Sequence, residues 1–240
     1  MNISNLFELY SEALLSGNRN QARNIIRKAI ASAIKPQEIY RQILFPAMEK
    51  VENMYRANEI SILIRNLATR INRFITDQVQ AQLIPADSSG KTAVIICAQA
   101  ETEELGAQMC CDLLEADGWN CYFLGGGVPD DEITAFLGQV TPDILVIYGS
   151  LPSGVPLTRQ LIERIHDIGS CPFMNIIVTG GIFNRVEGLW EEIKADFYAT
   201  DPVNVVDIAK NMNPKLHLPR NPSEPKRRRR LASGPIAAIN

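Results

Sequence analysis

The 240-residue chain has no apolar run that approaches the ~20 residues needed to cross a bilayer. Its first residues, MNISNLFELYSEALL, also lack the basic region and apolar core of a signal peptide. The formal net charge is only −3, so no global field draws the whole chain toward nucleic acid. These absences predict a cytoplasmic protein without a membrane span.

Residue types that serve catalysis and metal binding are also scarce. The chain has two histidines, His166 and His217, and its five cysteines lack the paired spacing of a zinc site or a disulfide framework. Reduced and mostly buried thiols are the common state of such cysteines. No Ser-His-Asp set, phosphate-binding loop or Cys-His arrangement occurs. We therefore expect no catalytic residues and no metal site, and a protein that is not an enzyme.

Residues 1–83 have the three- and four-residue apolar spacing of amphipathic helices. Gly17 ends the first helix as a C-cap glycine would. Pro36 stands where a third helix would begin, at a position that tolerates its missing N–H. Pro46 predicts a kink or break within that third helix. Four helices with short connections predict a helical-bundle domain over residues 1–83.

Residues 84–91, IPADSSGK, form an expected linker, and the periodicity changes after it. Apolar runs then alternate with amphipathic stretches through residue 212, which predicts an α/β fold with a five-stranded, doubly wound parallel sheet of Rossmann or flavodoxin type. The expected strands are residues 92–98, 120–126, 143–149, 175–181 and 195–200. In such sheets, ligands lie over the carboxyl ends of the strands.

Residues 213–240 are rich in proline, have no amphipathic period, and predict a disordered basic tail. Five consecutive positive charges stand within it: Lys226, Arg227, Arg228, Arg229 and Arg230. Such a run is most often a solvated segment. It is also the only part of the chain for which we expect contact with nucleic acid or with an acidic protein face.

Four segments carry a resemblance to a known family. They are ILFPAMEKVENMY, FLGGGVPDDEI, VTGGIF and KADFYATDPVNVVDIA, and they occur in the family's order. Over roughly residues 5–210, the chain resembles the cobalamin-binding module of methionine synthase, of methyltransferase corrinoid proteins and of light-sensing cobalamin-dependent regulators. The resemblance implies a helical cap over the sheet, cobalamin or another tetrapyrrole as cofactor, and a homo-oligomer as in light-sensing members.

The chain departs from the family at its cobalt-ligand motif, Asp-x-His-x-x-Gly. Glu101 stands in the place of the aspartate, Glu103 in the place of the histidine, and Gly106 keeps the glycine. A carboxylate is a harder ligand than imidazole and suits a corrin cobalt poorly. Glutamates at this point also complement the dipole of the following helix with no further role. We expect no histidine ligation of cobalt, and two alternatives stay open: a tetrapyrrole held without a protein ligand, or an empty pocket.

The resemblance also implies ligand-binding roles for residues that no sequence pattern would single out. Tyr55 takes the place of a tryptophan that faces the upper side of the corrin. Tyr148, Ser150 and Ser153 lie near the place of a small hydroxyl residue that meets the tail base, and Tyr148 would narrow that base pocket.

The glycine pair Gly180 and Gly181 follows the fourth expected strand. The resemblance implies that these glycines leave a path for the nucleotide tail of a corrinoid, because glycine lets the backbone approach a ligand closely. A tight turn without a ligand is the alternative.

Three functions fit these observations. The first is a regulatory or sensory protein, in gene regulation or in light or tetrapyrrole sensing, that acts through protein partners because no DNA-binding helices precede the cap. The second is a corrinoid carrier of a methyltransferase system, which the missing histidine disfavours. The third is a scaffold or assembly subunit that binds no ligand and docks through its tail.

Overall fold

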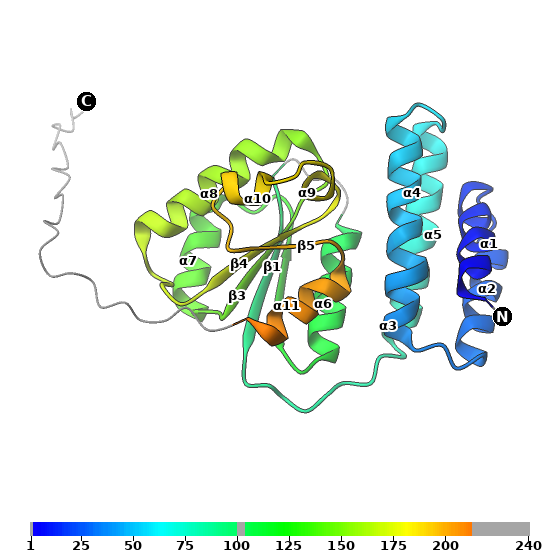
Figure 1. The fold of residues 1–240 in the computed structure, drawn as a ribbon, viewed down its shortest axis with the longest axis horizontal. Helices are drawn as coiled ribbons and strands as arrows, with labels where there is room; N and C mark the ends of the chain where they lie inside the picture. Colours follow the sequence, from blue (N-terminus) through cyan, green and yellow to red (C-terminus); the bar gives the residue numbers. More distant parts are fainter. Residues whose placement is uncertain (1, 100–103, 213–240) are drawn as a thin grey trace, which may run out of the picture.

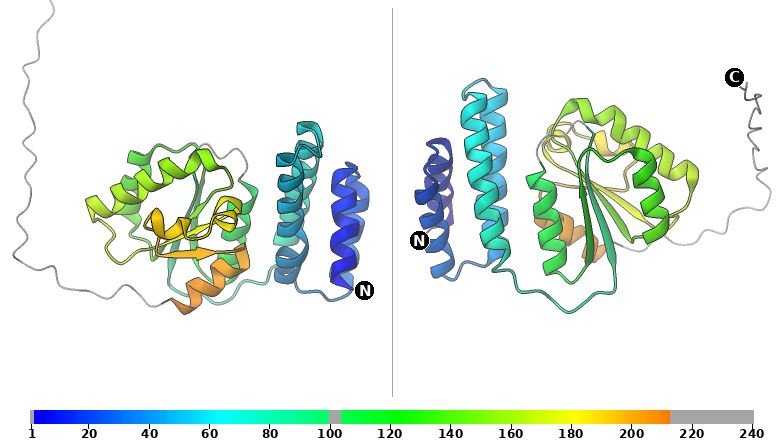
Figure 2. Two further views of the ribbon diagram at one scale, coloured as in Figure 1. Left: turned by 45° about the horizontal axis from the view of Figure 1, so that its top comes forward. Right: turned by 180° about the vertical axis from the view of Figure 1, so that it is seen from behind.

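The computed structural model describes residues 2–99 and 104–212. Its first part, the cap, is a set of helices drawn in blue and cyan in Figure 1. Their bounds are Ile3–Leu15 (α1), Arg19–Ala31 (α2), Pro36–Ile39 (α3), Phe45–Arg56 (α4) and Ile62–Gln80 (α5). In Figures 1 and 2, α4 and α5 stand between the α1–α2 pair and the sheet. The cap therefore meets the rest of the chain through α4, α5 and the segment that precedes them.

Local signals in the sequence account for the cap helices. Asn2, Asn18 and Ser61 each accept a hydrogen bond from a backbone N–H in the first turn of α1, α2 and α5. Such caps satisfy donors that a helix leaves unpaired at its start. The apolar stripe of α1 points into the bundle, with Leu6 and Tyr10 fully buried.

The predicted disturbance at Pro46 is present as a π-helical segment, Tyr40–Leu44 (η1), between α3 and α4. The backbone N–H of Phe45 donates to the carbonyl of Tyr40, five residues back. Pro46 has no N–H to offer to the preceding turn, so a widened turn costs little there. The third helix therefore continues through the proline instead of ending at it.

In the described part of the chain, five strands form one parallel sheet in the order β2-β1-β3-β4-β5. The strands are Thr92–Cys97 (β1), Asn120–Gly125 (β2), Ile144–Tyr148 (β3), Asn175–Thr179 (β4) and Phe197–Ala199 (β5). This is the expected doubly wound α/β fold with a helical cap. β1 and β3 are buried almost throughout, as continuous apolar runs at the centre of a parallel sheet require.

Helices cover both faces of the sheet (Figure 1). Residues of α6 (Leu105–Ala116) and α11 (Pro202–Asn211) share one apolar core with the cap. The second core takes residues from α7 (Asp130–Val140), α8 (Val155–Ile168), α9 (Gly181–Arg185) and α10 (Leu189–Glu192). The cap thus packs on the α6–α11 face.

Three elements differ from the sequence prediction. The strand expected to reach residue 181 ends at Thr179, because Gly180 turns the chain and the short helix α9 begins. The amphipathic stretch before the last expected strand forms only the four-residue helix α10. Helix α11 was not predicted, although Asp201 accepts a capping hydrogen bond and Pro202 follows at the first helical position.

Side-chain contacts join the cap to the α6–α11 face. The Tyr40 hydroxyl donates to Asp112 Oδ2 on α6 at 2.8 Å, and this pair is buried. Arg41 forms an ion pair with Asp207 on α11 at 3.0 Å. These contacts lie around η1. Within the described residues, no helix is both long and apolar enough to cross a membrane.

Candidate functional site

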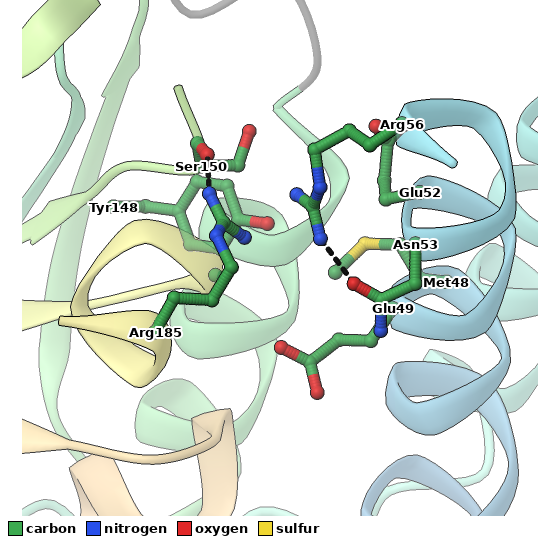
Figure 3. Close-up of a pocket in the computed structure, with 9 residues that line it drawn as sticks. Met48, Glu49, Glu52, Asn53, Arg56, Tyr148, Ser150 and Arg185 are labelled. Atoms are coloured by element: carbon green, nitrogen blue, oxygen red, sulfur yellow. Dashed lines mark hydrogen bonds between the residues drawn. The ribbon is translucent and has the colours of Figure 1, made fainter. Parts of the chain in front are cut away.

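A small cavity lies between α4 and the carboxyl ends of β3 and β4. Its volume is about 20 Å³, which is room for about one water molecule. Figure 3 shows the lining, which consists of Met48, Glu49, Glu52, Asn53 and Arg56 on the α4 side and Tyr148, Ser150, Gly181 and Arg185 on the sheet side. We call it the cap–sheet cavity. The carboxyl edge of a doubly wound sheet is where such folds bind ligands.

Tyr148 is the last residue of β3, and its side chain is buried on the cap side of the sheet. Its ring packs on Gly106 in the first turn of α6. A Cβ atom at Gly106 would lie 2.2 Å from Tyr148 Cε2, so any other residue there would displace the ring. Gly106 and Tyr148, two residues expected at the site, are therefore in direct contact.

Gly180 and Gly181, which follow β4, are each glycine for a different structural reason. Gly180 has φ of +107°, and a Cβ there would lie 2.4 Å from the carbonyl oxygen of Gly149. It is therefore required by the turn itself. A Cβ at Gly181 would lie 2.7 Å from Arg185 Nη1. The space over Gly181, which the resemblance reserved for a nucleotide tail, is occupied by the Arg185 side chain.

Two arginines face each other across the cap–sheet cavity (Figure 3). Arg185 Nη2 donates to the carbonyl oxygen of Ser150 at 2.6 Å. Arg56 donates to the side-chain oxygen of Asn53 on its own helix. Burial lowers the pKa of Arg185, and the nearby positive charge of Arg56 lowers it further. Neither arginine is predicted from the sequence as a site residue.

The acidic side chains of the cavity are held by other groups. Glu49 Oε1 accepts from Asn184 Nδ2 at 3.0 Å, and burial raises the pKa of the Glu49 carboxyl. Glu52 forms an ion pair with Arg65 at 2.6 Å. The Arg65 guanidinium also lies over the ring of Tyr55, 5.0 Å from its centroid. Tyr55, expected to face a corrin, does not line the cavity and has this guanidinium over its ring.

Ser150 lines the cavity, whereas Ser153 is exposed in the short 3₁₀ turn Pro152–Gly154. Of the acidic loop, Glu101 and Glu103 lie outside the described residues. Glu104 is described, and its Oε1 accepts from the backbone N–H of Gly126 at 2.6 Å.

Glu104 therefore ties the start of α6 to the turn after β2. The sequence does not predict this contact, because the partner of Glu104 is a backbone group 22 residues away. The predicted partner-binding residues Lys226, Arg227, Arg228, Arg229 and Arg230 also lie outside the described residues.

The arrangement does not fit a corrin as it stands. In the described part of the chain, no group of three or more His, Cys, Asp or Glu side chains could hold a metal ion. His166 is exposed near the end of α8 and does not line the cavity. Pockets for cofactor-sized ligands have volumes of about 300–1,000 Å³, and the cap–sheet cavity is far smaller.

A helical cap packed against a five-stranded parallel α/β domain defines the class of this chain as a two-domain module. Two family models, each described as B12 binding domain, match residues 6–80 and 91–207. The chain belongs to the two-domain cobalamin-binding family.

One of the solved structures to which the chain is similar has the same fold. The monomethylamine corrinoid protein of Methanosarcina barkeri is 17% identical with a TM-score of 0.76, and the match covers 85% of this chain and 97% of that one. A cobalamin-binding protein of Desulfitobacterium hafniense DCB-2 is 19% identical with a TM-score of 0.46, covering 87% and 97%. The methanol:cobalamin methyltransferase complex MtaBC of Methanosarcina barkeri is 16% identical with a TM-score of 0.47, covering 86% and 78%. No curated protein sequence matches the chain.

Proposed function

We propose that the chain is a regulatory member of the cobalamin-binding family that takes up a corrinoid or another tetrapyrrole between cap and sheet. It does so without a histidine ligand to cobalt and passes the binding event to a protein partner. The observation that supports this proposal is the narrow cap–sheet cavity of about 20 Å³ at the carboxyl edge of the sheet, in a chain that matches a B12 binding domain.

The narrow cavity favours a sensor because a tetrapyrrole is far larger than about 20 Å³ and can enter only if α4 moves away from α9. That movement breaks the hydrogen bond between Glu49 and Asn184, which joins the two sides at 3.0 Å. The buried contact between Tyr40 and Asp112 lies at the other end of the α6 face and can persist as a hinge. Binding is then linked to a change in the angle between cap and sheet, which a partner protein can read.

The first test measures uptake and movement together. Purified full-length chain is mixed with hydroxocobalamin, adenosylcobalamin or heme, and absorbance after gel filtration reports uptake. Small-angle scattering of the same samples reports the radius of gyration, which is expected to rise when the ligand is retained. Replacing Asn184 with alanine removes one closing contact and should strengthen uptake. Ligand retention with unchanged scattering would contradict a sensor that opens, and no retention of any of the three would contradict tetrapyrrole binding.

The partner step has its own test. The regulatory proposal expects a protein from the source cell to bind ligand-loaded and ligand-free chain with different affinity. Coupling of this kind is reciprocal, so the partner should also change the affinity of the chain for its ligand. A partner that binds both forms equally would favour the scaffold function instead.

A corrinoid carrier of a methyltransferase system is the second candidate. The likeness to the monomethylamine corrinoid protein, at a TM-score of 0.76 over most of both chains, favours it. The replacement of the family's histidine by Glu103 disfavours it. Chain loaded with methylcobalamin is mixed with a corrinoid methyltransferase and a thiol acceptor. Repeated methyl transfer would place the carrier function first.

A further inference from the structure

Helices α2 and α5 of the cap carry charge of almost one sign. Residues 1–83 hold 11 Lys and Arg residues against seven Asp and Glu residues, although the net charge of the whole chain is −3. Helix α2 contains no acidic residue, and Asp77 is the only one on α5. The Asp77 carboxylate accepts a hydrogen bond from Gln108 Nε2 on α6 at 2.8 Å. The charge of α2 and α5 is therefore almost entirely positive.

Arginines of the two helices lie on one side of the cap. The Arg19 guanidinium lies 3.8 Å from the centroid of the Phe74 ring on α5, and the Arg23 guanidinium lies 5.2 Å from it. Arg27 follows one turn later on α2 and is exposed. Arg70 is also exposed and stands one turn before Phe74 on α5. Because residues three or four apart share a helix face, the four arginines border the seam between α2 and α5.

None of these four arginines forms an ion pair in the described part of the chain. Arg23 Nε is buried without a hydrogen-bond partner. Arg19, Arg23 and Arg27 follow one another at steps of four residues, and like charges at that spacing repel each other on a helix. An anionic surface over α2 would relieve this repulsion.

Exposed aliphatic side chains stand next to the arginines. Ile62, Leu63 and Leu67 in the first turns of α5 have exposed fractions of 49%, 63% and 48%. A Cβ built on Gly17 would lie 3.6 Å from Leu67 Cδ1. Leu67 therefore lies beside the turn between α1 and α2, two residues before Arg19.

The aliphatic and basic side chains form one surface. Leu63, Leu67, Arg70 and Phe74 follow one another at steps of three or four residues, so they share one stripe of α5. The ring of Phe74 joins this stripe to α2 through Arg19. We call the surface the arginine–leucine face, and its members are Arg19, Arg23, Arg27, Ile62, Leu63, Leu67 and Arg70.

We propose that the arginine–leucine face docks on an anionic lipid surface. Arginine binds lipid phosphate through charge-assisted hydrogen bonds, while exposed leucine and isoleucine enter the boundary between headgroups and acyl chains. Clusters of about four to eight Lys and Arg residues on an amphipathic helix are typical of proteins that bind anionic lipid. Nucleic acid also offers phosphates, but phosphate contacts alone would leave the three aliphatic side chains in water.

A lipid surface is also continuous, so side chains from both helices can contact it at once. The inference goes beyond the proposed function, because it does not depend on a ligand in the cap–sheet cavity.

Co-sedimentation with vesicles tests the proposal on full-length chain without added tetrapyrrole. Vesicles of phosphatidylcholine alone are compared with vesicles of phosphatidylcholine and phosphatidylglycerol. The chain is expected to bind the anionic vesicles and not the neutral ones, and added salt should weaken this binding by screening the arginines. Absence of binding to the anionic vesicles would overturn the proposal, as would equal binding to both kinds.

Variants at exposed positions assign the binding to this face. Arg27→Gln and Arg70→Gln are each expected to weaken partition onto anionic vesicles about fivefold. Leu63→Asn changes the most exposed of the three aliphatic side chains and should weaken it about tenfold. Arg164→Gln and Ile168→Asn alter exposed positions of α8 and should leave partition unchanged.

The positive charges of Lys226–Arg230 can attract the same vesicles, so the substitutions in the cap decide the outcome. Wild-type partition in Arg27→Gln, Arg70→Gln and Leu63→Asn would overturn the assignment to this face. The same variants are titrated with a fluorescein-labelled DNA duplex. DNA binding that the two arginine variants weaken and Leu63→Asn leaves unchanged, with no binding to vesicles, would assign the face to nucleic acid instead.

Discussion

Replacing Asp112 with asparagine is expected to stabilise the folded chain at about pH 8. Asp112 is buried on α6, where its Oδ2 accepts the hydroxyl proton of Tyr40 at 2.8 Å. The pKa of Asp112 is raised from 3.8 to about 6, mainly because the carboxyl is buried; the Tyr40 hydrogen bond lowers this pKa, and the nearby Glu115 and Asp77 raise it. The carboxylate is therefore charged at neutral pH in a place that favours the neutral form.

The size and sign of this change in folding stability follow from the difference between the pKa of Asp112 in the folded state and its pKa in the unfolded state. About two pKa units correspond to about 3 kcal/mol. The pKa of Asp112 is higher in the folded state than in the unfolded state. Asp112 therefore contributes its full share to folding stability below about pH 4, and this contribution is lost as the pH rises through about 6. Asparagine has no charge to bury and still offers an oxygen to Tyr40. Asp112→Asn should thus exceed the wild type by up to about 3 kcal/mol at pH 8 and match it near pH 4.

The assay is urea unfolding followed by circular dichroism at about pH 4.5, 6 and 8. Tyr40→Phe is the companion variant: it removes the donor from a charged carboxylate, so it should destabilise the chain by about 1–3 kcal/mol at pH 8. A difference between Asp112→Asn and wild type that stays constant over this pH range would refute the reasoning. So would a variant that is less stable than the wild type at pH 8.

Three further predictions concern the site. Glu104→Ala should cost about 1–2 kcal/mol in urea unfolding because the Gly126 N–H loses its acceptor, whereas Glu104→Gln should recover most of this. Gly180→Ala should destabilise the chain by at least about 2 kcal/mol, since alanine at φ +107° also meets the Gly149 carbonyl; a smaller loss would show that the turn adapts. Tyr148→Ser should strengthen hydroxocobalamin binding in an absorbance titration by enlarging the cap–sheet cavity, and unchanged affinity would argue that this ring does not limit entry.

Much of the fold was predictable because buried positions of strands and helices are occupied by apolar residues, so their spacing in the sequence follows the secondary structure. The strand Thr92–Cys97 is an almost continuous apolar run, which is the usual pattern of a strand covered on both faces. Helix α9 escaped prediction because five residues are too short to show a period. Helix α11 was missed although Asp201 and Pro202 are ordinary start signals, because its segment was read only through its family likeness.

The site was less predictable, because its residues meet only through the tertiary fold. Arg56 and Arg185 are 129 positions apart, and neither belongs to a sequence motif that indicates a site residue. Gly180 was noticed as a glycine, but its role lies in the nearby Gly149 carbonyl, which no local pattern shows. The acidic loop drew attention for its charge, whereas the described contact of Glu104 is with a backbone N–H.

The π-helical segment Tyr40–Leu44 sets the rotational phase of everything that follows it in the cap. Each residue of a helix turns the chain by about 100°, and the wider turn that ends in the Phe45-to-Tyr40 hydrogen bond holds one residue more than an α-turn. If the same residues formed ordinary α-turns instead, α4 would be rotated by about that angle. Glu49 and Arg56 would then leave the cavity wall together, with no residue of the wall itself altered. The π-helical segment thus determines which face of α4 is turned toward the sheet.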